Sequence, residues 1–170
     1  MFTYRSKPFY PLRNLLKGAF AGLVGTAPMT AVMVTGWQLL PAEEKYPLPP
    51  RQITGEIAER VGLDDRMNEE QMVAATLFSH FGYGALFGFV YAMLEQRIPL
   101  PPSMKGLLAG LAVWVGSYLG WLPAAGILPP VTWHPWRRNV LMIVAHFVWG
   151  VTMRVVLKKL SAEKRYIDLS

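Results

Sequence analysis

The chain has 170 residues, a length that suits one domain, but only 16% of them are charged, against about 25% in soluble domains. It has no cysteine, which excludes disulfides, thiolate metal sites and thiol catalysis. The net charge is +6, yet no basic stretch is interleaved with aromatic residues on a soluble module, so we do not expect a nucleic-acid partner.

Four windows contain no charged residue at all, namely 18–42, 71–94, 106–136 and 139–153. A helix needs about 20 mainly apolar residues to cross a bilayer. The sequence therefore predicts an all-α membrane protein with four transmembrane helices in a single domain, residues 1–170. We place the spans at about 18–40, 69–94, 106–122 and 139–157. The last span reaches residue 157 if the Arg154 side chain extends toward the lipid headgroups.

The first span follows a basic, aromatic arm at residues 1–17, which we expect to lie along the inner membrane surface. Pro28 falls near the middle of the span, where a missing backbone N–H tends to kink a helix. The span begins Gly18-Ala-Phe-Ala-Gly22 and continues Thr26-Ala-Pro28-Met29-Thr30. These residues resemble the first span of small uncharacterised bacterial membrane proteins of the YagU-like type. The resemblance implies a bacterial plasma (inner) membrane and brings no known activity or functional residue with it.

The segment 43–70 between spans one and two is acidic. Ile53, Ile57 and Val61 recur every four residues, which predicts a short outer interfacial helix at 51–61 with these side chains on apolar groups. Gly62 is a suitable stop for that helix. Asn68, followed three residues later by Gln71, has the spacing of a capping box that would begin span two.

The segment 123–136 after span three contains four prolines, so we expect an interfacial or partly re-entrant loop rather than continuous helix. Arg137, Arg138 and Asn139 then introduce span four. We leave two roles open for them: they bind lipid phosphates, or they meet the acidic segment 43–70.

Three sequence matches recur in the same order. They pair residues 17–23 (KGAFAGL) with 105–111 (KGLLAGL), 40–50 (LPA…LPP) with 122–130, and 79–84 (SHFGYG) with 145–150 (AHFVWG). We interpret them as a duplication of a two-helix unit, with repeat one at about 17–97 and repeat two at about 105–160. Two spans per unit preserve orientation, so the repeats should be parallel.

Small residues recur at four-residue spacing in the spans, a pattern that lets helix backbones approach closely. The residues that we expect to serve packing, together with Pro28, are Gly18, Gly22, Gly84, Gly88, Gly106, Gly110, Gly116 and Gly120.

Lys and Arg are in excess at residues 1–17, 95–105 and 158–170, whereas the segment 41–70 carries eight acids and four bases. An excess of basic residues marks the cytoplasmic side, so we expect a multi-pass protein with both termini in the cytoplasm. Arg137 and Arg138 lie on the other side and count against this orientation.

Two histidines, His80 and His146, fall inside the spans, where an ionisable side chain is costly and therefore suggests a function. They are the candidate cofactor-binding residues. The pair is compatible with a haem or a polar ligand between helices. We favour the structural alternative, in which each histidine bonds a hydroxyl or carbonyl group of its partner span. The repeat alignment predicts equivalent positions for the two.

Apart from Glu69 and Glu70 at the start of the second span, the spans contain no Asp or Glu, and no catalytic motif or metal-ligand spacing is visible, so we do not expect an enzyme or a metal site. The leading prediction is a scaffold or accessory subunit of a larger membrane complex, in contact with the lipid bilayer and with other membrane subunits or copies of itself. Two alternatives stay open: a small oligomeric carrier or channel, and a bis-histidine haem-binding electron-transfer module.

Overall fold

The computed structural model describes residues 12–95 and 97–167. Of the N-terminal arm, residues 1–11 lie outside the described residues, and residues 12–17 belong to the first helix. In chain order the helical elements are α1 (Leu12–Gln38), η1 (Ala42–Glu44), α2 (Pro49–Arg60), η2 (Asp64–Arg66), α3 (Glu69–Leu94), α4 (Pro102–Val115), η3 (Gly116–Trp121), α5 (Leu122–Ala124), η4 (Val131–Trp133) and α6 (Trp136–Ile167).

Four helices are long and apolar enough to cross a membrane: α1, α3, the stretch Met104–Ala124 and the Trp136–Ala162 part of α6. The prediction of four transmembrane helices is therefore confirmed. Two of them extend beyond the predicted spans, because α1 begins at Leu12 and α6 runs to Ile167. Hydropathy marks only the part of a helix that lies in lipid, whereas its hydrogen bonding can continue into the polar region.

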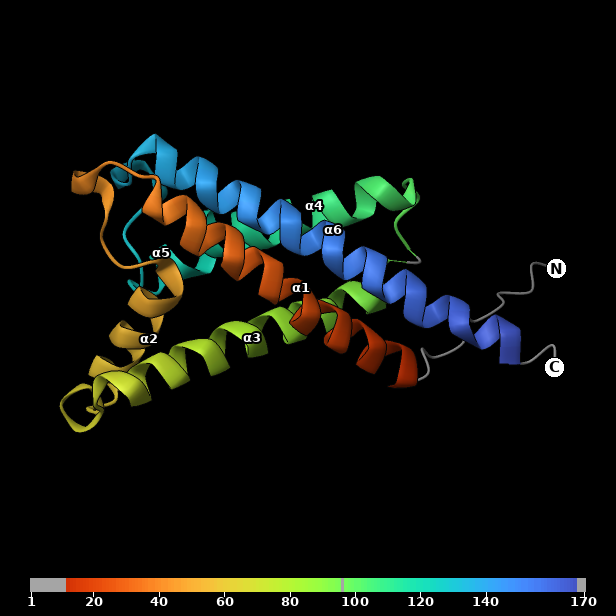
Figure 1. Ribbon diagram of the computed structural model, residues 1–170, viewed down its shortest axis with the longest axis horizontal. Helices are drawn as coiled ribbons and strands as arrows, with labels where there is room; N and C mark the ends of the chain where they lie inside the picture. Colours follow the sequence, from red (N-terminus) through yellow and green to blue (C-terminus); the bar gives the residue numbers. More distant parts are fainter. Residues whose placement is uncertain (1–11, 96, 168–170) are drawn as a thin grey trace, which may run out of the picture.

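The main contacts between the four long helices follow the order α3, α1, α6, α4, so that α1 and α6 each pack against two other long helices. The start of α1 and the last turns of α6 lie at one end, which we call the base end. The opposite end carries α2, α5 and the loops beside them, and we call it the cap end (Figure 1). Each outer helix therefore has one main partner, α3 on α1 and α4 on α6.

Glycines allow each outer helix to touch its partner backbone to backbone. A Cβ atom on Gly18 of α1 would lie 2.5 Å from the carbonyl oxygen of Gly88 in α3. In the other pair, a Cβ atom on Gly106 of α4 would lie 2.7 Å from the carbonyl oxygen of Gly150 in α6. No side chain fits at these distances, so the two hairpins depend on glycine for their close approach.

The two hairpins do not pack in the register that the sequence matches predict. Gly22 faces the carbonyl oxygen of Gly84, whereas Gly110, its counterpart in repeat two, faces that of His146. By these contacts, His146 in α6 occupies the position that Gly84 occupies in α3. The sequence alignment instead pairs His146 with His80. The difference is one helical turn, so our prediction of equivalent histidine positions is wrong. Side-chain volume, rather than the matched sequence, decides where two helices come into contact.

Three residues that we grouped with the packing glycines differ from the rest. Gly116 has no neighbour within 4 Å of an added Cβ atom, and Gly120 has only its own helix's Val115 carbonyl at 3.8 Å. Both belong to the π-helical turn η3, in which Gly120 has non-helical dihedral angles of φ −107° and ψ −109°. They shape this turn rather than a contact between helices. Pro28 lies inside α1, and the helix continues through it to Gln38.

The short helix predicted in the acidic segment is present as α2, which ends at Arg60 and is followed two residues later by Gly62, whose φ of +67° is left-handed. Ile53 and Ile57 line an apolar cavity, as expected. The prediction for Val61 is wrong, because it follows the helix and its side chain is 60% exposed. The four-residue spacing of apolar side chains continues to Val61, which is one residue past the end of α2.

The predicted capping box before α3 is confirmed, and the segment after α5 is not a continuous helix, as expected; its interfacial or re-entrant position stays a prediction. Asn68 and Gln71 form a reciprocal capping box at the start of α3, with N···O distances of 2.9 and 3.0 Å. The proline-rich segment 123–136 contains only the end of α5 and the single turn η4 before α6 begins.

Candidate functional site

A cavity of about 180 Å³ lies in the cap half of the bundle, is lined by all four long helices and α2, and is partly open to the surroundings of the bundle. Its lining is mainly apolar and aromatic, and it contains both intramembrane histidines. The lining residues are Thr26, Met29 and Met33 of α1; Pro49, Pro50, Ile53 and Ile57 of α2; Ser79, His80, Tyr83, Gly84 and Phe87 of α3; Val113, Ser117, Tyr118, Trp121 and Leu122 of α4 to α5; and His146 and Trp149 of α6.

His146 is buried, and its orientation is fixed by its own helix. Its Nδ1–H group donates to the carbonyl oxygen of Met142 at 2.7 Å, and the Tyr118 ring meets it edge to face at 5.8 Å. A charged imidazole is costly inside a membrane, so the ring is neutral. The other nitrogen, Nε2, therefore carries a lone pair and can accept a hydrogen bond.

His80 reaches the same cavity from α3, and its Nε2 atom is buried without a hydrogen-bond partner. We predicted that each histidine bonds a group on its partner span, and neither does. The hydroxyls of Thr26 and Thr30 in α1 donate to carbonyl oxygens four residues earlier in the same helix. Threonine hydroxyls in helices often donate to a backbone carbonyl of their own helix in this way. They are then not donated to His80, whose Nε2 atom stays without a partner.

A chain of polar groups crosses the cavity wall between α3 and η3. Trp121 donates its indole N–H to the Tyr83 hydroxyl at 3.0 Å, and that hydroxyl lies 2.8 Å from the Ser117 hydroxyl. The contact joins two outer helices that otherwise pack on different partners. Nothing in the sequence analysis predicted it, because Tyr83 and Ser117 resemble ordinary interfacial and packing residues.

The cap end of the cavity is closed by α2, which two arginines hold in place. Arg51 pairs with Glu69 at the start of α3 at 2.8 Å. Arg60 donates to the carbonyl oxygens of Ala125 and Gly126 at 2.8 and 2.9 Å. One short helix is thus fixed to both outer transmembrane helices.

A second cluster attaches the segment before α2 to the start of α6. The Arg138 side chain is buried and donates to the carbonyl oxygens of Glu44, Tyr46 and Pro47 at 2.8 to 2.9 Å. Its guanidinium lies 3.5 Å from the centre of the Tyr46 ring. Arg137 forms an ion pair with Glu44 at 2.9 Å. Of the two roles left open for these arginines, the structure shows contact with the acidic segment.

His134 and Tyr46 complete this cluster, with the Tyr46 hydroxyl 2.6 Å from His134 Nδ1. Burial, with a smaller contribution from Arg138, lowers the pKa of His134, so its ring is neutral at pH 7. Burial also raises the pKa of Tyr46, which keeps its proton. The Tyr46 hydroxyl therefore donates to His134.

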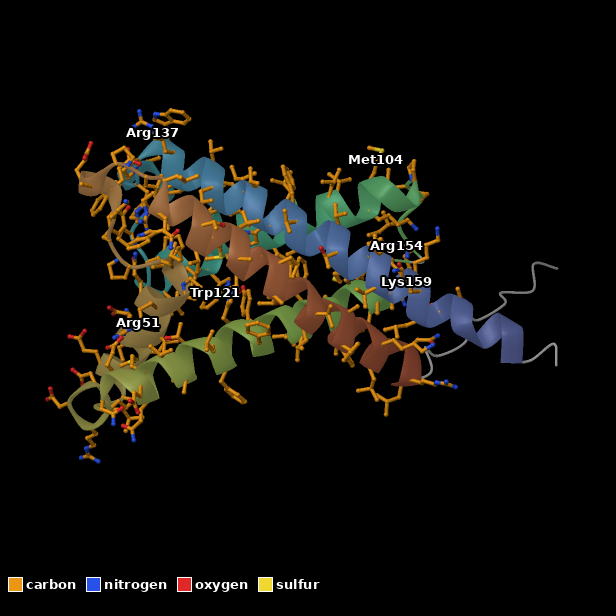
Figure 2. The ribbon with its side chains drawn as sticks, in the orientation of Figure 1. Arg51, Met104, Trp121, Arg137, Arg154 and Lys159 are labelled. Carbon is orange, nitrogen blue, oxygen red and sulfur yellow. The ribbon has the colours of Figure 1, made fainter. Side chains whose placement is uncertain are left out.

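The base end carries further charged contacts (Figure 2 labels Arg154 and Lys159 there). The Nε atom of Arg154 lies 3.6 Å from a carboxylate oxygen of Glu95 at the end of α3, and the extension of this side chain toward the headgroups stays a prediction. Lys105 donates to the Glu95 carbonyl at 2.7 Å, and Lys17 donates to the Leu160 carbonyl. Each lysine thus joins its hairpin to the other one.

Within the described residues, no group of three or more His, Asp or Glu side chains is placed to hold a metal ion. A haem does not fit the cavity either. A cavity of about 150 Å³ accommodates one benzene ring, and the 180 Å³ here leaves no room for the four rings of a porphyrin. The two histidines share a cavity of the size of a single substituted ring.

Comparison with known proteins gives a family and one curated relative. The inner membrane protein YagU of Escherichia coli (strain K12) is 27% identical over 82 residues, which are 48% of this chain and 40% of YagU. The chain thus spans less than half the length of that relative. No solved structure matches. A family model matches residues 29–155, a range that includes only residues 29 and 30 of the segment 18–30 on which we based the resemblance. The match covers most of the chain, which therefore belongs to the family described as "Protein of unknown function (DUF1440)".

Proposed function

We propose that this chain is an accessory membrane protein that holds a small lipophilic molecule inside the bilayer, in the cavity closed by α2. The observation that carries the proposal is the cavity itself. Its 180 Å³ accommodates a small molecule, and its walls are mainly apolar with a few fixed polar groups, as in small-molecule sites. The absence of Asp and Glu from the charge-free windows of the sequence supports binding rather than catalysis.

The scaffold role that we predicted loses part of its basis. Most of the small residues behind that prediction lie in the contacts inside the two hairpins, as described for Gly18 and Gly106. A smaller exposed patch remains on α4, where Ala112 and Gly116 would allow another helix to approach closely. An attachment to other membrane subunits would use this patch and would leave the cavity free.

A carrier or channel is less well supported. Such a protein needs a path to both sides of the membrane, and the cavity lies only in the cap half. Toward the base end, α1 touches α3 and α4 touches α6 through glycines, and Arg154, Glu95, Lys105 and Lys17 connect the two hairpins. We therefore favour a binding site without a pathway.

For orientation, we propose that the base end faces the cytoplasm of a bacterial cell, because Lys17, Lys105, Lys158 and Lys159 gather there. The chain has no cysteine, so single reporters are simple to introduce. In intact spheroplasts, a membrane-impermeant maleimide should label Asp65→Cys at the cap end and leave Ser161→Cys unlabelled. Labelling of Ser161→Cys alone would reverse the orientation.

The binding proposal is tested by native mass spectrometry of the protein released from its own membrane. We expect a bound non-protein mass on the wild-type chain. Val113→Phe fills the cavity and should lose that mass, whereas Val115→Phe, on the exposed face of the same helix, should retain it. Retention by both variants would place the molecule elsewhere, and a chain that binds neither a native molecule nor an added alkylbenzene would remove the proposal. The same spectra report protein partners.

A further inference from the structure

We infer that the molecule held in this cavity carries a quinol-type head group, a single six-membered ring with two oxygen substituents of which at least one is a hydroxyl. The inference rests on the proposed function, since it names the chemistry of the ligand for the same cavity. It concerns binding alone and involves no chemical change of the ligand.

The size and walls of the cavity favour a ring. A cavity of about 150 Å³ holds a benzene molecule, so 180 Å³ accommodates one ring with small substituents. Aromatic side chains surround the space, and they already pair with each other: Tyr83 with Phe87 at 4.6 Å between ring centres, and Tyr118 with His146 at 5.8 Å. Edge-to-face and offset contacts of this kind suit a flat aromatic ligand better than an alkyl chain.

On the α6 side, the cavity offers an acceptor. The Nδ1–H group of His146 is occupied by the Met142 carbonyl oxygen at 2.7 Å, so the free Nε2 atom of the neutral ring can only accept a hydrogen bond. A ligand that fits this wall must present an O–H or N–H group. A hydrocarbon or a molecule with carbonyl oxygens alone does not satisfy it.

On the wall formed by α3 and η3, the cavity offers a donor. Tyr83 and Ser117 together have two hydroxyl hydrogens, and their mutual contact of 2.8 Å uses one of them. Trp121 can only donate, and it occupies an acceptor position on the Tyr83 oxygen at 3.0 Å. Whichever hydroxyl donates within the pair, one hydrogen is left over for a ligand oxygen. The buried Nε2 atom of His80 on the same helix as Tyr83 is a further unpaired polar atom.

A suitable ligand therefore donates a hydrogen bond toward α6 and accepts one from the wall between α3 and η3. A quinol does both with one rigid ring, because its two oxygens lie on opposite edges. The corresponding quinone only accepts. The same head group could arrive on a lipid with an apolar tail or as a soluble phenol, and the experiment separates these two sources.

Binding is measured as ligand occupancy in native mass spectra of the wild-type chain at increasing concentrations of four compounds: decylhydroquinone, its dimethyl ether, decylbenzene and hydroquinone without a tail. We expect decylhydroquinone to bind most tightly. The dimethyl ether keeps the ring and both acceptors but cannot donate, so it should bind roughly tenfold more weakly. Ser117→Ala should weaken decylhydroquinone binding by a similar factor and leave decylbenzene unaffected, whereas the exposed Ser161→Ala should change neither.

Each outcome separates the inference from the proposed function. Equal affinity for decylhydroquinone, its ether and decylbenzene would overturn the quinol inference and leave lipophilic binding intact. If none of the four compounds binds, both the quinol inference and the proposed binding function are wrong. Tight binding of tail-free hydroquinone would support the ring chemistry and assign the ligand to the soluble phenols. Because these comparisons use the wild-type chain, they do not depend on the folding of any variant.

Discussion

Gly88→Ala should lower the stability of the protein by about 3 kcal/mol, at the upper end of the usual cost of overpacking. Its new Cβ atom would lie 2.2 Å from the carbonyl oxygen of Gly18 and 2.8 Å from the Cα atom of Gly22. Both neighbours are backbone atoms of α1, so no side chain can rotate away. The two helices would have to separate along much of their contact, and thermal unfolding in a mild detergent would measure the loss.

Gly82→Ala is the matched control on the same helix. Gly82 is exposed and has no neighbour within 4 Å of an added Cβ atom. Alanine is favoured over glycine inside a helix by up to about 1 kcal/mol, so this variant should be unchanged or more stable than the wild type. An equal loss of stability in both variants would mean that the effect comes from α3 itself and not from its contact with α1.

Arg138→Ala should cost about 3–5 kcal/mol, the range for breaking a buried charged contact. The side chain serves three carbonyl oxygens before α2 and lies against the Tyr46 ring. Its removal would leave these oxygens without a partner in a buried place, and the α1–α2 connection would lose its main attachment to α6. Protease cleavage of the segment 43–48 should accelerate along with the loss of thermal stability.

Two further variants test whether the forked guanidinium is required. Arg138→Lys keeps the charge but cannot reach three carbonyl oxygens in one plane, so its stability should fall between the wild type and Arg138→Ala. Arg66→Ala removes an arginine from the exposed turn η2 and should change the stability by no more than about 0.5 kcal/mol. If Arg138→Lys equals the wild type, only the charge matters and the hydrogen-bond geometry does not.

The spans, the capping box and α2 could all be predicted from the sequence because each depends on residues close together in the chain. Lipid excludes unpaired backbone groups, so charge-free windows of about 20 residues have few alternatives to helix. Asn68 and Gln71 are three residues apart, and their contact is decided locally. The end of α2 was less predictable, since Val61 continues the apolar spacing although the helix stops before it.

The candidate site could be predicted only in part. The cost of an ionisable group in the membrane singled out His80 and His146, and both line the cavity. Their arrangement depends on how the two hairpins pack, and the one-turn difference between Gly84 and His146 could not be read from matched sequences. Tyr83 and Ser117 are far apart in the chain, and their contact exists only in the assembled bundle. The duplication itself stays a prediction.

The order in which the long helices contact one another has a consequence for how the protein is made. The first hairpin, α1 and α3, is complete in sequence before α4 is synthesised, and the second hairpin, α4 and α6, follows as a unit. Each hairpin can therefore close through its own glycines as soon as it leaves the insertion machinery. The contacts between hairpins form only after α6 has been synthesised. Examples are the hydrogen bond of Trp149 to the Gly22 carbonyl and that of Arg138 to the segment before α2. Biogenesis would then end with the closing of the cavity, so that a ligand already dissolved in the bilayer could be enclosed at that step.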